Sequence, residues 1–193
     1  MKSIFVFYFF VSVAISSANA QEWVKDWVAK NSIMMLKPDS MITLLTHDFQ
    51  KAISTPAPTF SFKRLDDDKF QNLKDFRGNV VLVSFWATNC SGCRYEMPGL
   101  SHLQDSLSAK GLQVIFLSSE SKDLLIRYFT DYKISGIKGI LKPNQLKQPY
   151  QMFAYPSSFV VDRNGIVRDT WLGPLKFDIL VKRVLPYLVA NNK

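Results

Sequence analysis

The sequence predicts an α/β fold in which helices flank a mixed central sheet, and two observations lead to that prediction. The runs VVLVSFW at 80–86 and LQVIFLSS at 112–119 are rich in β-branched and aromatic residues, as is typical of strands buried on both faces. Each run is followed by a segment in which apolar residues recur at helical spacing. Strands that alternate with helices in this way are typical of a sheet covered by helices.

The elements around the first run follow from local signals. Short edge strands are expected at Thr59–Leu65 and at Phe70, on either side of the acidic turn 66–68. After the first run, helical spacing continues to Gly111, which is expected to end the helix. The apolar positions of that helix are Leu100, Leu103 and Leu107.

The remaining elements lie after the second run. A helical pattern covers 124–129, and the segments SSFVVD and IVRDTW then flank Asn164-Gly165, a dipeptide that favours a β-hairpin turn. The last amphipathic segment runs from Leu175 to Val189, and we expect Pro186 to bend or end it.

The first twenty residues are predicted to be a secretory signal peptide. They combine Lys2, an apolar stretch from Ile4 to Ile15 and a small-x-small ending at 18–20. About twelve apolar residues are fewer than the roughly 20 that span a bilayer, so we favour cleavage after Ala20 over a retained anchor. The mature chain is therefore expected in the periplasm or another exported location, where disulfides persist.

Residues 21–55 are expected to form an N-terminal helical extension, and 56–193 the main domain. Trp23 and Trp27 share one helical face, a second apolar stripe follows, and STPAP at 54–58 indicates a linker. The two stripes are expected to pack on the domain as a helical cap, or to make a homodimer through 21–55.

The formal net charge of +8 falls to +7 when Lys2 leaves with the signal peptide. The lysines are scattered along the chain, which favours a solvated basic face over an acidic partner or an anionic membrane surface. Nucleic acid is not expected as a partner outside the cytoplasm.

Both cysteines of the chain, Cys90 and Cys93, lie in the segment FWATNCSGC. Zinc requires four ligands, and the two histidines, His47 and His102, form no second closely spaced pair, so no metal is expected. A purely structural disulfide is also disfavoured, because a ring closed over two intervening residues removes little entropy from the unfolded chain.

A redox centre fits the segment better. Cys90 stands at a helix N-terminus, where free N–H groups and the helix dipole favour a thiolate. Cys93 follows one turn later and can close a disulfide with Cys90. The pair is therefore expected to open and close reversibly.

With these residues, the chain resembles the thioredoxin-like superfamily, and within it the exported TlpA-, ResA- and DsbE-like reductases. VVLVSFWATNCSGCRYEMP at 80–98 is similar to the strand, redox motif and following Glu-x-Pro of that branch. APTFSFKRLDDDKFQNLKDFRGNVV at 57–81 and YPSSFVVDRNGIV at 155–167 resemble its entry hairpin and its later strand and hairpin. The resemblance covers roughly residues 57 to 190 and implies a thioredoxin-like sandwich.

The resemblance also implies roles for single residues. Pro156 matches the cis-proline that sits against the disulfide, and Glu96 matches a glutamate that lines the site, with proton transfer at Cys93 as its expected role. Favourable interaction of Glu96 with the helix dipole is the alternative. Ser84 occupies the place of the buried aspartate of cytoplasmic thioredoxins.

Residues beside the motif are expected to contact substrate. These are Tyr155 before the proline, Trp86, and Asn89, which replaces the tryptophan usual before the first cysteine. Gly92 replaces the proline frequent before the second cysteine. Such changes are expected to shift redox potential and partner choice.

The resemblance implies an exported protein thiol-disulfide oxidoreductase that needs no cofactor. It is expected to reduce disulfides in envelope proteins, such as apocytochrome c or copper-site proteins, with electrons from a membrane donor of the thiol-reducing type. One alternative is a disulfide oxidase or isomerase. The other is a Cu(I)-binding module that uses Cys90, Cys93, Met97 and His102. A peroxiredoxin is disfavoured, because Ala87 stands where its signature has threonine.

Overall fold

The computed structural model describes residues 49–142, 145 and 154–189. The chain divides into two compact units, Met1–Leu44 and Leu45–Lys193, and everything described here belongs to the second. The predicted signal peptide, and residues 21–48 of the predicted extension, lie outside the described residues. Among the helices of the described part, none combines the length and the apolar character needed to cross a bilayer.

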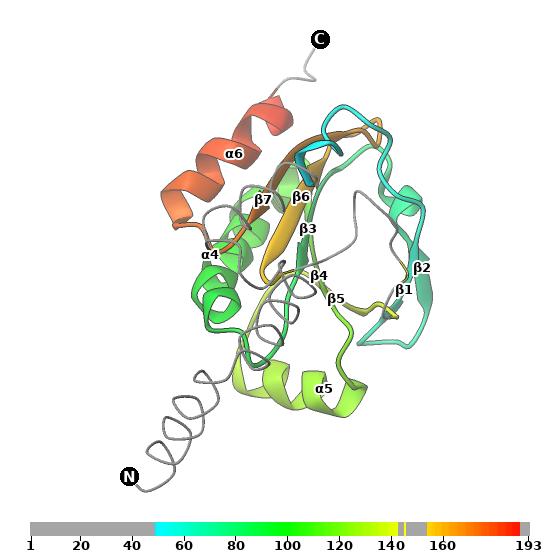
Figure 1. Ribbon diagram of the computed structural model, residues 1–193, viewed down its shortest axis with the longest axis vertical. Coiled ribbons are helices and arrows are strands. Elements are labelled where there is room, and N and C mark those ends of the chain that lie inside the picture. The colour runs from blue at the N-terminus through cyan, green and yellow to red at the C-terminus, as the bar shows by residue number, and fades with distance from the viewer. Residues whose placement is uncertain (1–48, 143–144, 146–153, 190–193) are drawn as a thin grey trace, which may run out of the picture. The chain divides into compact units, whose positions relative to one another are not determined.

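Seven strands form one mixed sheet in the order β2-β1-β5-β4-β3-β6-β7 (Figure 1). The neighbours β3–β4 and β4–β5 are parallel, and all other neighbours are antiparallel. The strands are β1 Ser61–Arg64, β2 Phe70–Asn72, β3 Val80–Phe85, β4 Leu112–Ser118, β5 Ile137–Ile140, β6 Ser157–Val161 and β7 Val167–Leu172.

Within the described residues, the sheet is accompanied by the α-helices α4 Ser91–Leu107, α5 Lys122–Asp131 and α6 Phe177–Val189. The short 3-10 helices η2 Leu73–Phe76 and η3 Ser108–Lys110 precede β3 and β4. Gly111 has a φ of 87° after η3, a left-handed conformation that glycine adopts without steric cost, so the chain can turn from helix into β4. Figure 1 shows α4 and α6 lying along the same part of the sheet.

Alternate residues of β3 enter two separate hydrophobic cores. Val80, Leu82 and then Trp86 join side chains of the three α-helices. Val81, Val83 and Phe85 join the other core, which Phe49 and Ala52 help to close. Both faces of β3 are buried, and this explains why its sequence is a continuous apolar run instead of an alternating one.

The predicted fold class is confirmed, with some differences in detail. Strand β1 is not at an edge, because it pairs with β2 on one side and β5 on the other. Strand β5 was not predicted, since its four residues include Gly139, which normally weakens a strand. Here the glycine makes room for an aromatic ring, because a Cβ at Gly139 would lie 2.3 Å from Phe62 Cδ2.

The structure modifies two further expectations. Helix α6 ends at Val189 as predicted, so Pro186 does not end it, and a bend at Pro186 stays a prediction. The carbonyl that Pro186 leaves without a donor is that of Lys182, an exposed residue, so water can satisfy it. The segment 54–58 is no free linker, because Ser54 N and Ala57 N donate to the carbonyls of Val167 and Gly165.

Candidate active site

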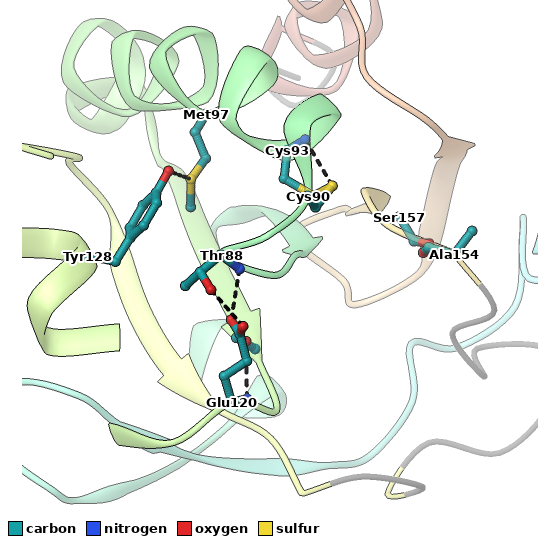
Figure 2. The surroundings of a disulfide bond; sticks show 9 residues. Thr88, Cys90, Cys93, Met97, Glu120, Tyr128, Ala154 and Ser157 are labelled. Carbon is teal, nitrogen blue, oxygen red and sulfur yellow. Dashed lines mark hydrogen bonds between the residues drawn. A yellow bond between two sulfur atoms is a disulfide. The ribbon is translucent and has the colours of Figure 1, made fainter. Parts of the chain in front are cut away.

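Cys90 and Cys93 form a disulfide at the N-terminus of α4, with their Cα atoms 5.3 Å apart (Figure 2). Cys90 is the N-cap residue of α4, and its Sγ accepts a hydrogen bond of 3.1 Å from the backbone N–H of Cys93. The strand β3 ends at Phe85, so the buried core of the sheet fixes the short loop that presents Cys90. The sulfur thus lies where the first turn of a long helix offers free N–H groups.

The two cysteines differ in exposure. Cys93 is 1% exposed, whereas Cys90 is half-buried and accessible from outside. A partner disulfide can therefore reach Cys90 first. In the reduced protein, the helix N-terminus stabilises negative charge on Cys90 more than on the buried Cys93.

Glu96 lies one helical turn after Cys93 and is 1% exposed. Its Oε1 accepts hydrogen bonds from Trp171 Nε1 at 3.0 Å and from the backbone N–H of Leu175 at 3.1 Å, while Oε2 is buried without a partner. Burial outweighs these two hydrogen bonds and raises the pKa of Glu96 to about 7. The carboxyl can therefore gain or lose a proton near neutral pH.

Ser84 is buried in β3, in the place where cytoplasmic thioredoxins have a buried aspartate. This position therefore holds no acid. By strand alternation it shares the face of Leu82 and Trp86, which α4 covers. The structure places a buried acid on α4, as Glu96, one turn from Cys93.

Pro156 is buried, and its Cδ would lie 3.5 Å from a Cβ placed on Gly92 of the motif. The Tyr155–Pro156 peptide bond is cis, the isomer that the resemblance implies. The carbonyl of Pro156 accepts a hydrogen bond of 2.8 Å from Gly173 N. Strand β6 starts immediately afterwards, with Ser157 opposite Phe85 at the end of β3. Pro156 is thus fixed at the end of the sheet where β3 stops and the loop to Cys90 begins.

Two of the three predicted contact residues are accessible to a partner. Asn89 is exposed beside Cys90, and Tyr155 is 40% exposed. Trp86 is only 1% exposed, because its ring packs against Tyr128 and Phe129, with centroids 4.9 and 5.3 Å away. Direct substrate contact by Trp86 is therefore corrected to a supporting role behind the motif.

Glu120 is a site residue that the sequence analysis missed. Its carboxylate accepts hydrogen bonds from Thr88 N at 2.8 Å and Thr88 Oγ1 at 2.7 Å (Figure 2). It also accepts one from Ser118 Oγ at 3.1 Å. These bonds hold the loop before Cys90 against the end of β4. The signal was present, since β3 and β4 are parallel and a carboxylate that follows one strand lies beside the loop that follows the other.

Two of the groups proposed for Cu(I) make other contacts. Met97 is 2% exposed and its Sδ accepts a hydrogen bond of 3.6 Å from Tyr128 Oη, whereas His102 is exposed with its ring 5.1 Å from that of Phe177. In the part of the chain that the structure describes, no three His, Cys, Asp or Glu residues are grouped so as to hold a metal ion.

Comparisons with known proteins agree with this geometry. Residues 53–170 match the sequence profile of the AhpC/TSA family. The chain is 32% identical over 121 residues to the thioredoxin-like protein YneN of Bacillus subtilis, covering 62% of this chain and 71% of that protein. It is 31% identical over 123 residues to the thiol-disulfide oxidoreductase ResA of Bacillus thuringiensis subsp. konkukian, covering 63% of this chain and 70% of that protein.

Among solved structures, the fold is similar to that of a putative thiol:disulfide interchange protein DsbE from Chlorobium tepidum. The TM-score is 0.65 at 26% identity, over 70% of this chain and 97% of that one. A secreted thiol-disulfide isomerase from Corynebacterium glutamicum shares the fold with a TM-score of 0.62 at 21% identity, over 68% of this chain and 84% of that one.

Proposed function

The chain belongs to the AhpC/TSA family and is a thiol-disulfide oxidoreductase with a thioredoxin-like fold, and from that premise we propose that it reduces disulfides in exported proteins. The observation that supports this most directly is the asymmetry of the cysteine pair. Cys90 is accessible at the start of α4, and Cys93 is buried one turn behind it. Attack by one sulfur and release by the other is the chemistry that such a pair performs.

In the proposed reaction, the Cys90 thiolate attacks one sulfur of a partner disulfide. The S–S bond of the partner breaks, a mixed disulfide with Cys90 forms, and the leaving sulfur takes up a proton. Cys93 then loses its proton and attacks Cys90 Sγ, which releases the second partner sulfur as a thiol. Two electrons pass to the partner, and Cys90 and Cys93 end as a disulfide.

Glu96 is the proposed acceptor of the Cys93 proton. It is buried on α4 one helical turn after Cys93, and its pKa of about 7 lets the carboxylate accept a proton at neutral pH. The same property permits the reverse transfer when an electron donor regenerates the dithiol.

The proposed location is outside the cytoplasm. The predicted signal peptide at 1–20 supports export, as do relatives named ResA and a neighbour named DsbE. The proposed substrates are disulfides of envelope proteins, with apocytochrome c and copper-site proteins as candidates, and a membrane protein is the proposed electron donor. A homodimer through residues 21–55 stays a prediction.

The direction of electron flow is tested by the redox state of the cysteine pair in living cells. Acid quenching followed by thiol alkylation should find Cys90 and Cys93 mostly reduced, because a reductase needs a continuous electron supply. A mostly oxidised pair would refute the reductase and favour an oxidase. A parallel sample with Cys90→Ser marks the migration of a protein that cannot form the disulfide.

A further inference from the structure

The loop between β7 and α6, residues 173–176, passes directly over the dipeptide that separates the two cysteines. Gly92 lies inside the redox motif, and a Cβ placed on it would be 3.1 Å from Pro174 Cγ and 3.2 Å from Pro174 Cδ. Carbon atoms in ordinary contact are about 3.5–4.0 Å apart. A side chain at position 92 would therefore press on the proline ring, which would have to shift by a few tenths of an ångström.

The same loop ends at Glu96. Leu175, the residue after Pro174, donates its backbone N–H to Glu96 Oε1 at 3.1 Å. At its other end, Gly173 N donates to the Pro156 carbonyl at 2.8 Å, and Gly173 has a φ of 81°. The left-handed turn at Gly173 directs the next residue toward the motif, and glycine adopts it without steric cost. Three consecutive residues thus contact Pro156, Gly92 and Glu96 in turn.

We propose that Pro174 is a positioning residue: its ring, seated on Gly92, holds the N–H of Leu175 on the Glu96 carboxyl and so couples the cysteine dipeptide to the proton affinity of that carboxyl. The proposal rests on the proposed function in taking Glu96 as the proton acceptor. It adds a reason for glycine at position 92, where a Cβ would lie closer to the Pro174 ring than ordinary van der Waals contact.

Few other groups act on Glu96. The adjacent strands β3 and β4 carry no titratable side chain. Asp169 of β7 and Arg183 of α6 pair with each other, and the guanidinium lies over the Trp171 ring, 5.1 Å from its centroid. The hydroxyl of Tyr128 on α5 donates a hydrogen bond to Met97 Sδ. On α4 itself, Cys93 is in the disulfide, so it does not titrate in the oxidised protein.

The test measures the ionisation of Glu96 directly in the oxidised full-length protein. The chain has only three glutamates, Glu22, Glu96 and Glu120, so selective ¹³C labelling of glutamate carboxyls gives three resonances, and Glu96→Gln identifies one of them. The indole N–H resonance of Trp171 should follow the same titration, because that group is bonded to Glu96.

Gly92→Ala is the first variant. The added methyl group must displace Pro174, and the N–H of Leu175 moves away from the carboxylate it stabilises. We expect the Glu96 midpoint to rise from about 7, by about 0.5 to 1 pH unit. Gly99→Ala is the matched control, because it adds a methyl group to the same helix against Leu180 and Phe177 instead of Pro174, and should leave the midpoint unchanged.

Pro174→Ala completes a double-mutant cycle. With the ring removed, Gly92→Ala should produce no further shift, because the contact that transmits its effect is gone. An equal shift in both backgrounds, or no shift from Gly92→Ala, would overturn the proposal. If Gly92→Ala does not fold, Pro174→Ala alone tests the proposal, since Pro174 is exposed and its replacement leaves the core intact. An unchanged Glu96 midpoint in Pro174→Ala would then overturn the proposal.

Disulfide exchange assayed on the same samples separates this proposal from the proposed function. Unchanged Glu96 midpoints in a protein that still exchanges disulfides would reject the positioning role alone. The expected midpoints in a wild-type protein that exchanges no disulfide would reject the proposed function alone.

Discussion

Replacing Glu96 by glutamine should make the protein more stable at high pH but not at low pH. The pKa of Glu96 is about 7 in the folded protein, against the ordinary glutamate pKa of 4.5 that applies in the unfolded chain. Because the folded-state pKa is raised, the folded protein binds more protons than the unfolded chain between these two values. The contribution of Glu96 to the free energy of unfolding is therefore fully present below pH 4.5 and is lost as the pH rises through 7.

The size of the effect follows from that difference. About 2.5 pH units at 1.36 kcal/mol each correspond to roughly 3 kcal/mol, the approximate cost of the buried carboxylate above pH 8. Glutamine has the shape of the protonated acid, and its single oxygen can accept from both Trp171 and Leu175. At pH 8.5, Glu96→Gln should thus raise the free energy of unfolding by about 3 kcal/mol, and at pH 4.5 by less than about 1 kcal/mol.

Urea unfolding of the oxidised proteins at both pH values measures this gain. The control is Glu120→Gln, which removes the same charge from a carboxylate held by three hydrogen bonds, and which should lower stability at both pH values. Parallel stability–pH curves for wild type and Glu96→Gln would refute the reasoning, because they would mean that Glu96 titrates alike in the folded and unfolded states.

Three other predictions concern the cysteines, the loop before them and the core. Cys93→Ala should accumulate mixed disulfides with partner proteins on non-reducing gels, whereas Cys90→Ala should form none; equal amounts in both would contradict the assignment of Cys90 as the attacking sulfur. Glu120→Gln should cost about 1–2 kcal/mol, since one amide oxygen cannot replace two carboxylate oxygens that bond Thr88; unfolding by urea measures it, and unchanged stability would show that these bonds contribute nothing. Leu82→Ala should cost about 3 kcal/mol in the same assay, because the fully buried side chain leaves a cavity; a loss below about 1 kcal/mol would mean that the core collapses around it.

Local patterns predicted much of the fold and the centre of the site. The continuous apolar run of β3, the helix that starts at Cys90 and the hairpin turn at Asn164-Gly165 each depend on residues close together in the sequence. The roles expected of Cys90 and Cys93 follow from a single helix terminus. Such features are visible in one sequence because the residues that cause them are neighbours.

The surroundings of Glu96 could not be predicted in this way. Its hydrogen-bond donors, Trp171 and Leu175, lie 75 and 79 residues along the chain and belong to elements that meet α4 only in the folded protein. Strand β5 was missed for a related reason. Gly139 is a local signal against a strand. It is explained by the ring of Phe62, which lies far away in the sequence but on the neighbouring strand β1.

The two sides of the site come from the open end of one hairpin. Ser157 pairs with Leu172 there, so Tyr155–Pro156 and the loop 173–176 are held in a fixed register. Trp171 and Leu175 belong to the same segment, and both bind Glu96. Exchanging this hairpin to alter the proposed partner contacts at Tyr155–Pro156 would therefore also alter the hydrogen bonds to Glu96. The proposed selectivity and the proposed proton transfer thus depend on the same hairpin.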